Sequence, residues 1–206
     1  LFPYTTLFRS KDRILTIENL KLSFPVFQGA VSVLNNVSMH INRGEIVGVV
    51  GESGSGKSVT AMLSMRLIPQ GSYHINSGKL EVMGRDVLDA SEAEMRKIRG
   101  NKVAMIFQEP MTALNPTRRI GKQMADVIRQ HRQFSHKQAR ERAVELLTEM
   151  QIADPGSVLE RYPFELSGGM RQRVMIALAF SCDPDLLIAD EPTTALDVTV
   201  QRQVLR

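Results

Sequence analysis

The residues best suited to chemistry form a glycine-rich run, GESGSGKS, at residues 51–58. It matches the pattern G-x-x-x-x-G-K-[ST], whose glycines let backbone N–H groups turn toward phosphate oxygens. We expect Lys57 to reach the β- and γ-phosphates of a nucleotide and the Ser58 hydroxyl to bind Mg²⁺. A helix after the run would add partial positive charge from its N-terminus. The predicted contacts are Gly51, Glu52, Ser53, Gly54, Ser55, Gly56, Lys57, Ser58 and Val59.

Two adjacent carboxylates follow a short apolar run. Asp190 and Glu191 come directly after residues 186–189, which read as a buried strand. At the end of that strand Asp190 is placed to hold Mg²⁺, directly or through water. Glu191 can orient and deprotonate an attacking water. Alone, the pair is equally typical of a solvated strand end or a helix cap, but after a phosphate-binding loop it favours nucleotide hydrolysis.

A second glycine motif, at residues 166–170, precedes another predicted helix. Ser167, Gly168 and Gly169 would supply a hydroxyl, closely approaching backbone amides and a helix dipole, which together suit an anion. Two γ-phosphate sites far apart in one sequence suggest that each faces a different nucleotide. The simplest arrangement is a head-to-tail dimer with two ATP molecules between the subunits. Taken alone, the motif is also an ordinary helix cap.

Apolar periodicity predicts the strands that must hold these residues. A small antiparallel sheet is expected from segments 14–24, 33–41 and 79–83. Buried parallel strands are expected at 45–50, 103–107 and 186–189, because each is a short, continuous apolar run.

Helices are expected over 57–67, 91–99, from Ile120, from Ser135 and over 168–181. Ser91 with Glu94, and Ser135 with Gln138, form capping boxes. Pro155 and Gly156 are expected to break the helix that begins after Ser135. This order predicts an α/β fold, with a mixed core, an antiparallel β subdomain and a helical subdomain inserted at about 110–183.

The composition is that of a globular protein with one domain. The chain has 206 residues, of which 43% are hydrophobic, 23% charged and 5% aromatic, and its net charge is +4. A nucleic-acid-binding protein would more often show a dense basic patch with interleaved aromatic residues. The single cysteine, Cys182, excludes an intrachain disulfide and is expected to be a small buried residue. The longest apolar run, 174–180, is shorter than the ~20 residues that span a bilayer.

The two ends of the chain differ from the rest. Residues 1–10, LFPYTTLFRS, resemble a translated DNA-sequencing adapter and are predicted to be non-native, which leaves 11–206 as the natural domain. Residues 198–206 have the character of a helix that stops soon after it starts. The chain is therefore expected to be a fragment of a longer protein.

Taken in order, the motifs resemble those of the ATP-binding subunit of ABC (ATP-binding-cassette) transporters over residues 14–206. The resemblance implies a P-loop ATPase core with ATP and Mg²⁺ as cofactors. It makes Gln108 the glutamine that links Mg²⁺ and the attacking water to the membrane subunits, so that Lys57, Gln108 and Glu191 are catalytic. It gives Mg²⁺ the ligands Ser58, Gln108 and Asp190.

Two further contacts to nucleotide follow from the same resemblance. Asp197, in the sequence Ala-Leu-Asp, corresponds to a residue that contacts the site of the opposite subunit. An aromatic residue upstream of the glycine-rich run stacks on adenine in this family. Phe27 is the candidate for that role in this chain, and Phe24 is the runner-up.

The sequences at 107–116, 167–177 and 189–201 are similar to those of importers for oligopeptides, dipeptides, nickel and glutathione. Met170 replaces the usual glutamine of the 166–170 signature, as in that branch, whereas Phe164 stands where the branch often has histidine. The resemblance implies an ATPase that powers the import of peptides or related solutes. The implied partners are transmembrane permease subunits, a second ATP-binding subunit in a homo- or heterodimer and, indirectly, an extracytoplasmic solute-binding protein, but no nucleic acid. The implied location is the cytoplasmic face of the bacterial inner membrane.

Two other interpretations stay open. One is a soluble ABC ATPase that acts on DNA or ribosomes, although its DNA-repair members carry a long coiled coil where this chain has a short stretch. The other is an inactive truncated fragment, because the switch histidine of the family is expected one strand beyond Asp197, past residue 206. The four histidines of the chain are expected at the surface instead, namely His40, His74, His131 and His136.

Overall fold

The computed structural model describes residues 13–109 and 113–191, and the chain divides into two compact units between Met95 and Arg96. Helix α2 (Glu92–Ile98) crosses this division. It begins with the predicted capping box, in which Ser91 N donates to Glu94 Oε2 at 2.9 Å and Glu94 N donates to Ser91 Oγ at 3.3 Å. The predicted non-native segment 1–10, Asp197 and the predicted helix from residue 198 lie outside the described residues.

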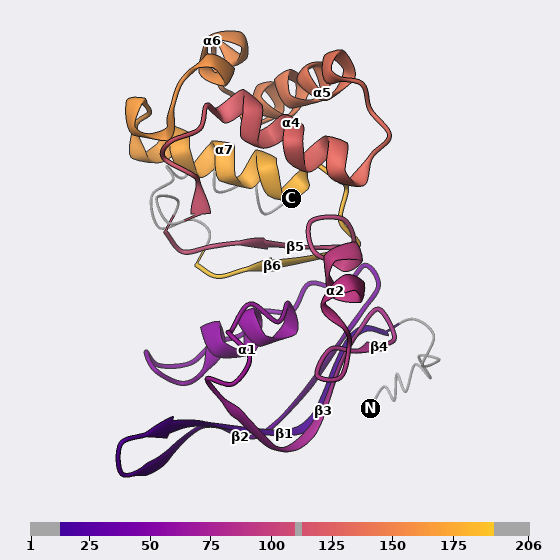
Figure 1. The fold of residues 1–206 in the computed structure, drawn as a ribbon, viewed down its shortest axis with the longest axis vertical. Helices are drawn as coiled ribbons and strands as arrows, with labels where there is room; N and C mark the ends of the chain where they lie inside the picture. Colours follow the sequence, from indigo (N-terminus) through magenta and orange to yellow (C-terminus); the bar gives the residue numbers. More distant parts are fainter. Residues whose placement is uncertain (1–12, 110–112, 192–206) are drawn as a thin grey trace, which may run out of the picture. The chain divides into compact units, whose positions relative to one another are not determined.

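The first unit is built on a four-stranded antiparallel sheet with the order β2-β1-β3-β4 (Figure 1). Its strands are β1 (Arg13–Val26), β2 (Gly29–Asn42), β3 (His74–Val82) and β4 (Arg85–Asp86). The core of this unit includes branched residues from three of these strands. The buried residues include Ile17, Leu20, Leu22, Leu34, Leu80 and Val82. The predicted antiparallel sheet is therefore confirmed.

The predicted buried strand at 45–50 is wrong for this structure. These residues form no strand, and Ile46 and Val50 are 92% and 95% exposed. A strand is held by hydrogen bonds to its neighbours. Among the described residues of the first unit, the sheet contains only antiparallel pairs, and none of them includes this segment. Apolar composition alone therefore does not produce a strand where the backbone finds no pairing partner.

Helix α1 (Lys57–Ser64) follows the glycine-rich run, as predicted, although it is shorter than expected. Its last turn buries Leu63 and Ser64. The chain leaves the helical conformation at Arg66, whose φ is 51°. A residue with a left-handed backbone commonly closes a helix, because it cannot continue the right-handed turn.

The second unit contains a two-stranded parallel sheet, β5 (Val103–Ile106) and β6 (Leu186–Ala189). The pairs run in register from Val103–Leu186 to Ile106–Ala189, so both strands end at the same edge. Helix α7 (Gly168–Phe180) packs beside this sheet, and its residues Met175 and Ile176 are buried in one cluster with Ile106. Both strands and this helix were predicted, and all three are confirmed.

Helix α7 also belongs to a helical bundle with α4 (Ile120–His131), α5 (His136–Glu149) and α6 (Pro155–Glu160) (Figure 1). The buried core of the bundle includes Ile120, Met124, Ile128, Ala139, Ala143, Leu146, Leu147, Val158 and Val174. Within α4 and α5 these buried residues recur three or four positions apart, which is the spacing of one face of a helix. The extent of the predicted helical subdomain, about 110–183, stays a prediction.

The ends of α5 show one confirmed and one wrong prediction. Ser135 N donates to Gln138 Oε1 at 2.9 Å and Gln138 N donates to Ser135 Oγ at 3.3 Å, which is the predicted capping box. Pro155 does not break this helix, because α5 has already ended at Glu149. Instead, Pro155 occupies the first turn of α6, where the missing N–H of proline leaves no helical bond unmade.

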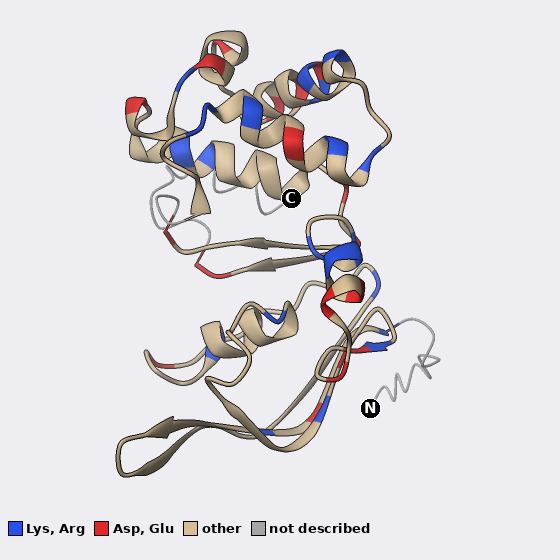
Figure 2. Ribbon diagram, in the orientation of Figure 1, with Lys and Arg blue, Asp and Glu red and all other residues tan. Residues whose placement is uncertain are grey.

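Acidic and basic residues are interspersed over α4 and α5 (Figure 2). Glu160, at the end of α6, accepts hydrogen bonds from Arg140 at 2.7 Å and from Arg119 at 3.1 Å. The hydrogen bond and charge of Arg140, joined by those of Arg119, lower the pKa of the Glu160 carboxyl below its usual range. This carboxylate therefore links residues that flank or belong to three helices.

Candidate functional site

The glycine-rich run forms a loop onto which its own lysine folds. Lys57 Nζ donates to the carbonyl oxygens of Gly51 at 2.7 Å and Glu52 at 2.9 Å. Ser55 N donates to the same Glu52 carbonyl at 3.2 Å. Among the described residues, no side chain caps the N-terminus of α1. The loop thus combines an ammonium group with helical N–H groups that no side chain covers, which suits an anion.

Gly56 is the residue of this loop that tolerates a side chain least. It is the N-cap of α1 and has a φ of 90°, in the left-handed region. A Cβ at this position would lie 2.7 Å from Leu34 Cδ2 and 3.2 Å from the Val33 carbonyl oxygen, both on β2. The glycine therefore serves two purposes, since it permits the turn into α1 and lets the loop lie against the strand.

The two aromatic candidates for adenine lie at different places on the β1–β2 hairpin. Phe27 is in the turn that joins the strands and is fully exposed. Phe24 is half-buried on β1 and pairs with Val31. Val33, which touches the loop at Gly56, lies about 7 Å along β2 from Val31 but about 13 Å from Gly29 at the turn, given the usual rise per strand residue. The register therefore places Phe24 nearer to the loop than Phe27.

The acid pair lies at the edge where β5 and β6 end. Asp190 N donates to Ile106 O at 3.0 Å, which extends the parallel ladder by one step. Beyond it, Gln108 Nε2 donates to Glu191 Oε2 at 2.7 Å. Gln108 and Glu191 are exposed, and Asp190 is half-buried. The structure thus brings together a carboxamide and two carboxylates that the sequence analysis assigned to one site.

The second glycine motif opens α7. Ser167 is the N-cap, and its Oγ accepts a hydrogen bond from Met170 N at 3.3 Å. Leu166 before it is buried, and its carbonyl accepts from Arg171 Nη1 at 2.9 Å. A Cβ at Gly168 would meet no atom within 4 Å. Ser167 therefore caps the helix, which was one of the two roles expected from the sequence. The space beside Gly168 in the same turn is open.

The predicted site residues fall into three groups. The loop at 51–59 belongs to the first unit, whereas the Gln108–Asp190–Glu191 group and the Ser167–Gly169 turn belong to the second. Within the described part of the chain, no three His, Cys, Asp or Glu side chains gather as a metal site. Ser58, Gln108 and Asp190 all carry oxygen donors, which is the chemistry that Mg²⁺ requires. Mg²⁺ commonly takes few protein ligands and completes its shell with water and phosphate, so these residue types fit it.

The arginines that bind Asp183, shortly before β6, were not predicted from the sequence. Asp183, whose φ is 46°, accepts hydrogen bonds from Arg142 at 3.1 Å and from Arg132 at 3.3 Å. Arg132 also donates to the carbonyl of Cys182. Burial of the Cys182 side chain, as predicted, raises the pKa of its thiol. No spacing rule links residues this far apart, so the sequence carried no signal for this cluster.

An aromatic pair also escaped prediction. The rings of Tyr162 and Phe164 stack with centroids 5.5 Å apart, and the Arg119 guanidinium lies 5.8 Å from the Tyr162 centroid. Phe164 is 63% exposed. The pair lies shortly before the Ser167 turn in the sequence.

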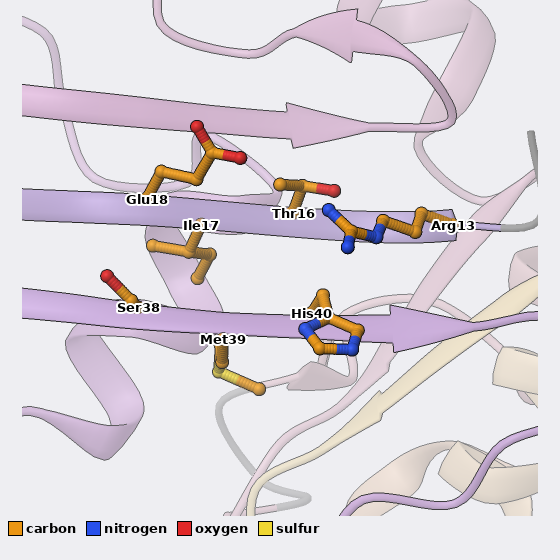
Figure 3. A pocket seen from close by; sticks show the side chains of 7 residues that line it. All are labelled: Arg13, Thr16, Ile17, Glu18, Ser38, Met39 and His40. Carbon is orange, nitrogen blue, oxygen red and sulfur yellow. The ribbon is translucent and has the colours of Figure 1, made fainter. Parts of the chain in front are cut away.

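A cavity of about 200 Å³ lies on β1 and β2, and none of the predicted site residues lines it (Figure 3). Its lining residues are Arg13, Thr16, Ile17, Glu18, Ser38, Met39 and His40. His40 is therefore part of a strand surface, and His74, at the start of β3, lies in the same sheet. His131 ends α4, where burial and the charge of Arg132 lower its pKa.

Known sequences show extensive similarity to this chain. The profile of the ABC transporter family matches residues 34–194. The chain is 69% identical over 193 residues to the probable D,D-dipeptide transport ATP-binding protein DdpD of Escherichia coli (strain K12), covering 94% of this chain and 59% of that protein. It is 48% identical over 193 residues to the oligopeptide transport ATP-binding protein OppD of Bacillus subtilis (strain 168), covering 94% and 54%. The chain thus spans somewhat more than half the length of these curated relatives.

Solved structures of ATP-binding cassettes have a fold similar to that of this chain. The dimeric, post-hydrolysis structure of the ATP-binding cassette MJ0796 bound to ADP and Pi has a TM-score of 0.82 to this chain. The two sequences are 27% identical, and the match covers 93% of this chain and 79% of that chain. Over residues 13–109 and 113–191, none of the helices has the length and apolar character needed to cross a bilayer.

Proposed function

The chain belongs to the ABC transporter family, and on this premise we propose that it is the ATP-binding and ATP-hydrolysing subunit of an importer for peptides or related small solutes. The observation that carries the proposal is the group at the ends of β5 and β6, where Gln108, Asp190 and Glu191 meet. Two carboxylates and an amide at the ends of two strands can bind a metal ion and orient a water molecule. The glycine-rich loop adds the complementary group, an ammonium beside helical N–H groups.

Each residue has a defined role in the proposed reaction. Lys57 and the backbone of the loop hold the β- and γ-phosphates. The oxygen of a water attacks the γ-phosphorus, the bond from that phosphorus to the bridging oxygen breaks, and ADP leaves. Glu191 accepts the proton of the water and later returns it to solvent or phosphate. Ser58, Asp190 and the amide oxygen of Gln108 would hold Mg²⁺, which neutralises charge on the phosphate oxygens when it is bound.

The remaining residues of the proposed site contact either the adenine base or the nucleotide bound by a second subunit. The hairpin register favours Phe24 over Phe27 as the residue that stacks on adenine. Ser167, Gly168, Gly169 and Asp197 would contact the nucleotide held by a second ATP-binding subunit, which is either another copy or a homologous chain. The open space at Gly168 and the dimeric state of the similar cassette MJ0796 support this arrangement.

The importer assignment rests on the relatives. DdpD is named for D,D-dipeptide transport and OppD for oligopeptide transport, which supports a peptide as the solute. In that case the chain works with transmembrane permease subunits at the cytoplasmic face of the membrane, and a solute-binding protein on the other side delivers the peptide. Nucleic acid has no role in this proposal.

Reconstitution tests the importer assignment. The full-length protein is assembled with the permeases encoded beside it in proteoliposomes, and ATP hydrolysis is measured with and without the peptide-loaded binding protein. We expect the loaded binding protein to stimulate hydrolysis and uptake of labelled peptide together. A rate that is indifferent to permease and binding protein would contradict the importer assignment and favour a soluble ABC ATPase.

A further inference from the structure

The hydrogen bond between Gln108 and Glu191 follows from the register of β5 and β6. Ile106 pairs with Ala189, and Asp190 N then bonds to Ile106 O, so the two chains stay parallel beyond the last strand residues. Gln108 and Glu191 each lie two positions beyond that pair. A carboxylate ion has no proton to give, so the nitrogen of the amide faces it and donates. The 2.7 Å separation is typical of a hydrogen bond strengthened by charge.

Glu191 needs a partner to hold one orientation. Its φ of 48° is left-handed, a backbone conformation that is unfavourable for a residue with a side chain. Its side chain is also exposed, so its contacts within the protein, of which the bond from Gln108 is one, decide which rotamer it holds. The bond from Gln108 joins the carboxylate to a strand end fixed by its ladder. One orientation of the carboxylate is thereby favoured before a water arrives.

We propose that Gln108 is a positioning residue for Glu191, in addition to the role of its amide oxygen toward Mg²⁺. This inference rests on the proposed function, in which Glu191 accepts the proton of the attacking water. The amide nitrogen engages one carboxylate oxygen, and a carboxylate accepts through both of its oxygens. The amide of Gln108 thus orients the Glu191 carboxylate through its nitrogen, while its oxygen is available to Mg²⁺.

The substitution Gln108→Glu separates the two roles. It keeps an oxygen ligand for Mg²⁺ but removes the donor and places a second carboxylate beside Glu191. If Gln108 were only a metal ligand, the variant would bind Mg²⁺ at least as well and retain its rate. We expect instead that kcat for ATP falls about tenfold or more at pH 8, while KM for ATP stays within about twofold, as for other residues that orient a catalytic group.

The split between kcat and KM distinguishes positioning from weakened binding. Poorer binding of the nucleotide would raise KM, whereas loss of the alignment of Glu191 lowers kcat and leaves KM nearly unchanged. Gln133→Glu, at an exposed glutamine between α4 and α5, is the matched control and should keep the kcat and KM of the wild type.

A second measurement observes the bond directly in the nucleotide-free, full-length protein. The side-chain amide signals of ¹⁵N-glutamine are recorded, and those of Gln108 are identified by their loss in Gln108→Glu. They should shift in Glu191→Ala and stay in place in Glu141→Ala. Unmoved signals, or an undiminished kcat in Gln108→Glu, would overturn the positioning role. A wild-type protein that does not hydrolyse ATP would instead refute the proposed function, and the amide signals would still decide the inference.

Discussion

The side-chain amide of Gln108 donates a 2.7 Å hydrogen bond to Glu191 Oε2, although the two residues are 83 positions apart in the chain. The parallel register of β5 and β6 brings them together, because each follows the last paired residue of its strand by two positions. A site of this kind is assembled by strand pairing, because the residues around Gln108 do not encode its contact with Glu191, and the converse also holds.

Gly56→Ala should lower both stability and nucleotide affinity. The alanine would adopt a left-handed φ and bring its Cβ to 2.7 Å from Leu34 Cδ2, so we expect a loss of about 2–3 kcal/mol in the free energy of unfolding. Denaturant unfolding and titration with a non-hydrolysable ATP analogue measure the two effects. Gly44→Ala is the control, because Gly44 also has a positive φ but no atom within 4 Å. Equal losses in the two variants would show that the contact with β2 is unimportant.

Phe24→Ala should weaken ATP binding through the base alone. Stacking of an aromatic ring on a base contributes about 1–3 kcal/mol, so we expect the Kd for an ATP analogue to rise about tenfold. Tripolyphosphate, which has no base, should bind the variant and the wild type equally. Phe27→Ala, at the exposed hairpin turn, should bind both ligands normally. The opposite pattern, with Phe27→Ala impaired and Phe24→Ala normal, would restore Phe27 as the stacking residue.

Ser167→Arg should leave ATP binding by the isolated subunit intact but abolish ATP-driven dimerisation and hydrolysis. The reason is that the Ser167 turn is proposed to contact the nucleotide of a second subunit. The substitution also removes a helix cap, at a cost of about 1 kcal/mol. Ser135→Arg removes a comparable cap from α5 and controls for that loss. Light scattering with ATP and a phosphate-release assay give the readouts, and a dimerising Ser167→Arg variant would disprove the shared site.

Glu160→Gln should make the stability of the bundle less sensitive to acid. Hydrogen bonding and charge from Arg140, and then Arg119, lower the pKa of Glu160 in the folded protein. The unfolded state therefore binds more protons than the folded state, and stability is lost as the pH falls from the unfolded pKa, near 4.5, through the folded one. The Tm of the variant should lie below that of the wild type at pH 7, and the difference should shrink below pH 4. A constant difference in Tm would contradict the linkage.

Local patterns in the sequence predicted much of this structure. The two capping boxes, the starts of α4 and α5, and the strands β5 and β6 were predicted because each depends on residues close together in the chain. The segment at 45–50 shows where this reasoning fails. Its apolar composition is that of a buried strand, but a strand also needs a paired backbone, which composition does not encode.

The candidate site was predicted in part for the same reason. The glycine-rich loop, the acid pair and the Ser167 turn are continuous motifs and could be read directly. Of the arginines around Asp183, Arg132 directly follows α4 and Arg142 lies in α5, and their meeting depends on how the helices pack. The choice between Phe24 and Phe27 likewise depended on the hairpin register, which became available only from the strand pairs.

The most direct test of the proposed function is the rate of ATP hydrolysis by Glu191→Gln in the full-length protein. The substitution keeps the size of the side chain but removes the proton-accepting carboxylate. We predict that phosphate release falls by at least about a hundredfold while ATP still binds and still drives dimerisation, since general base catalysis contributes roughly that much. Hydrolysis at the wild-type rate in this variant would contradict the role of Glu191 and the function built on it.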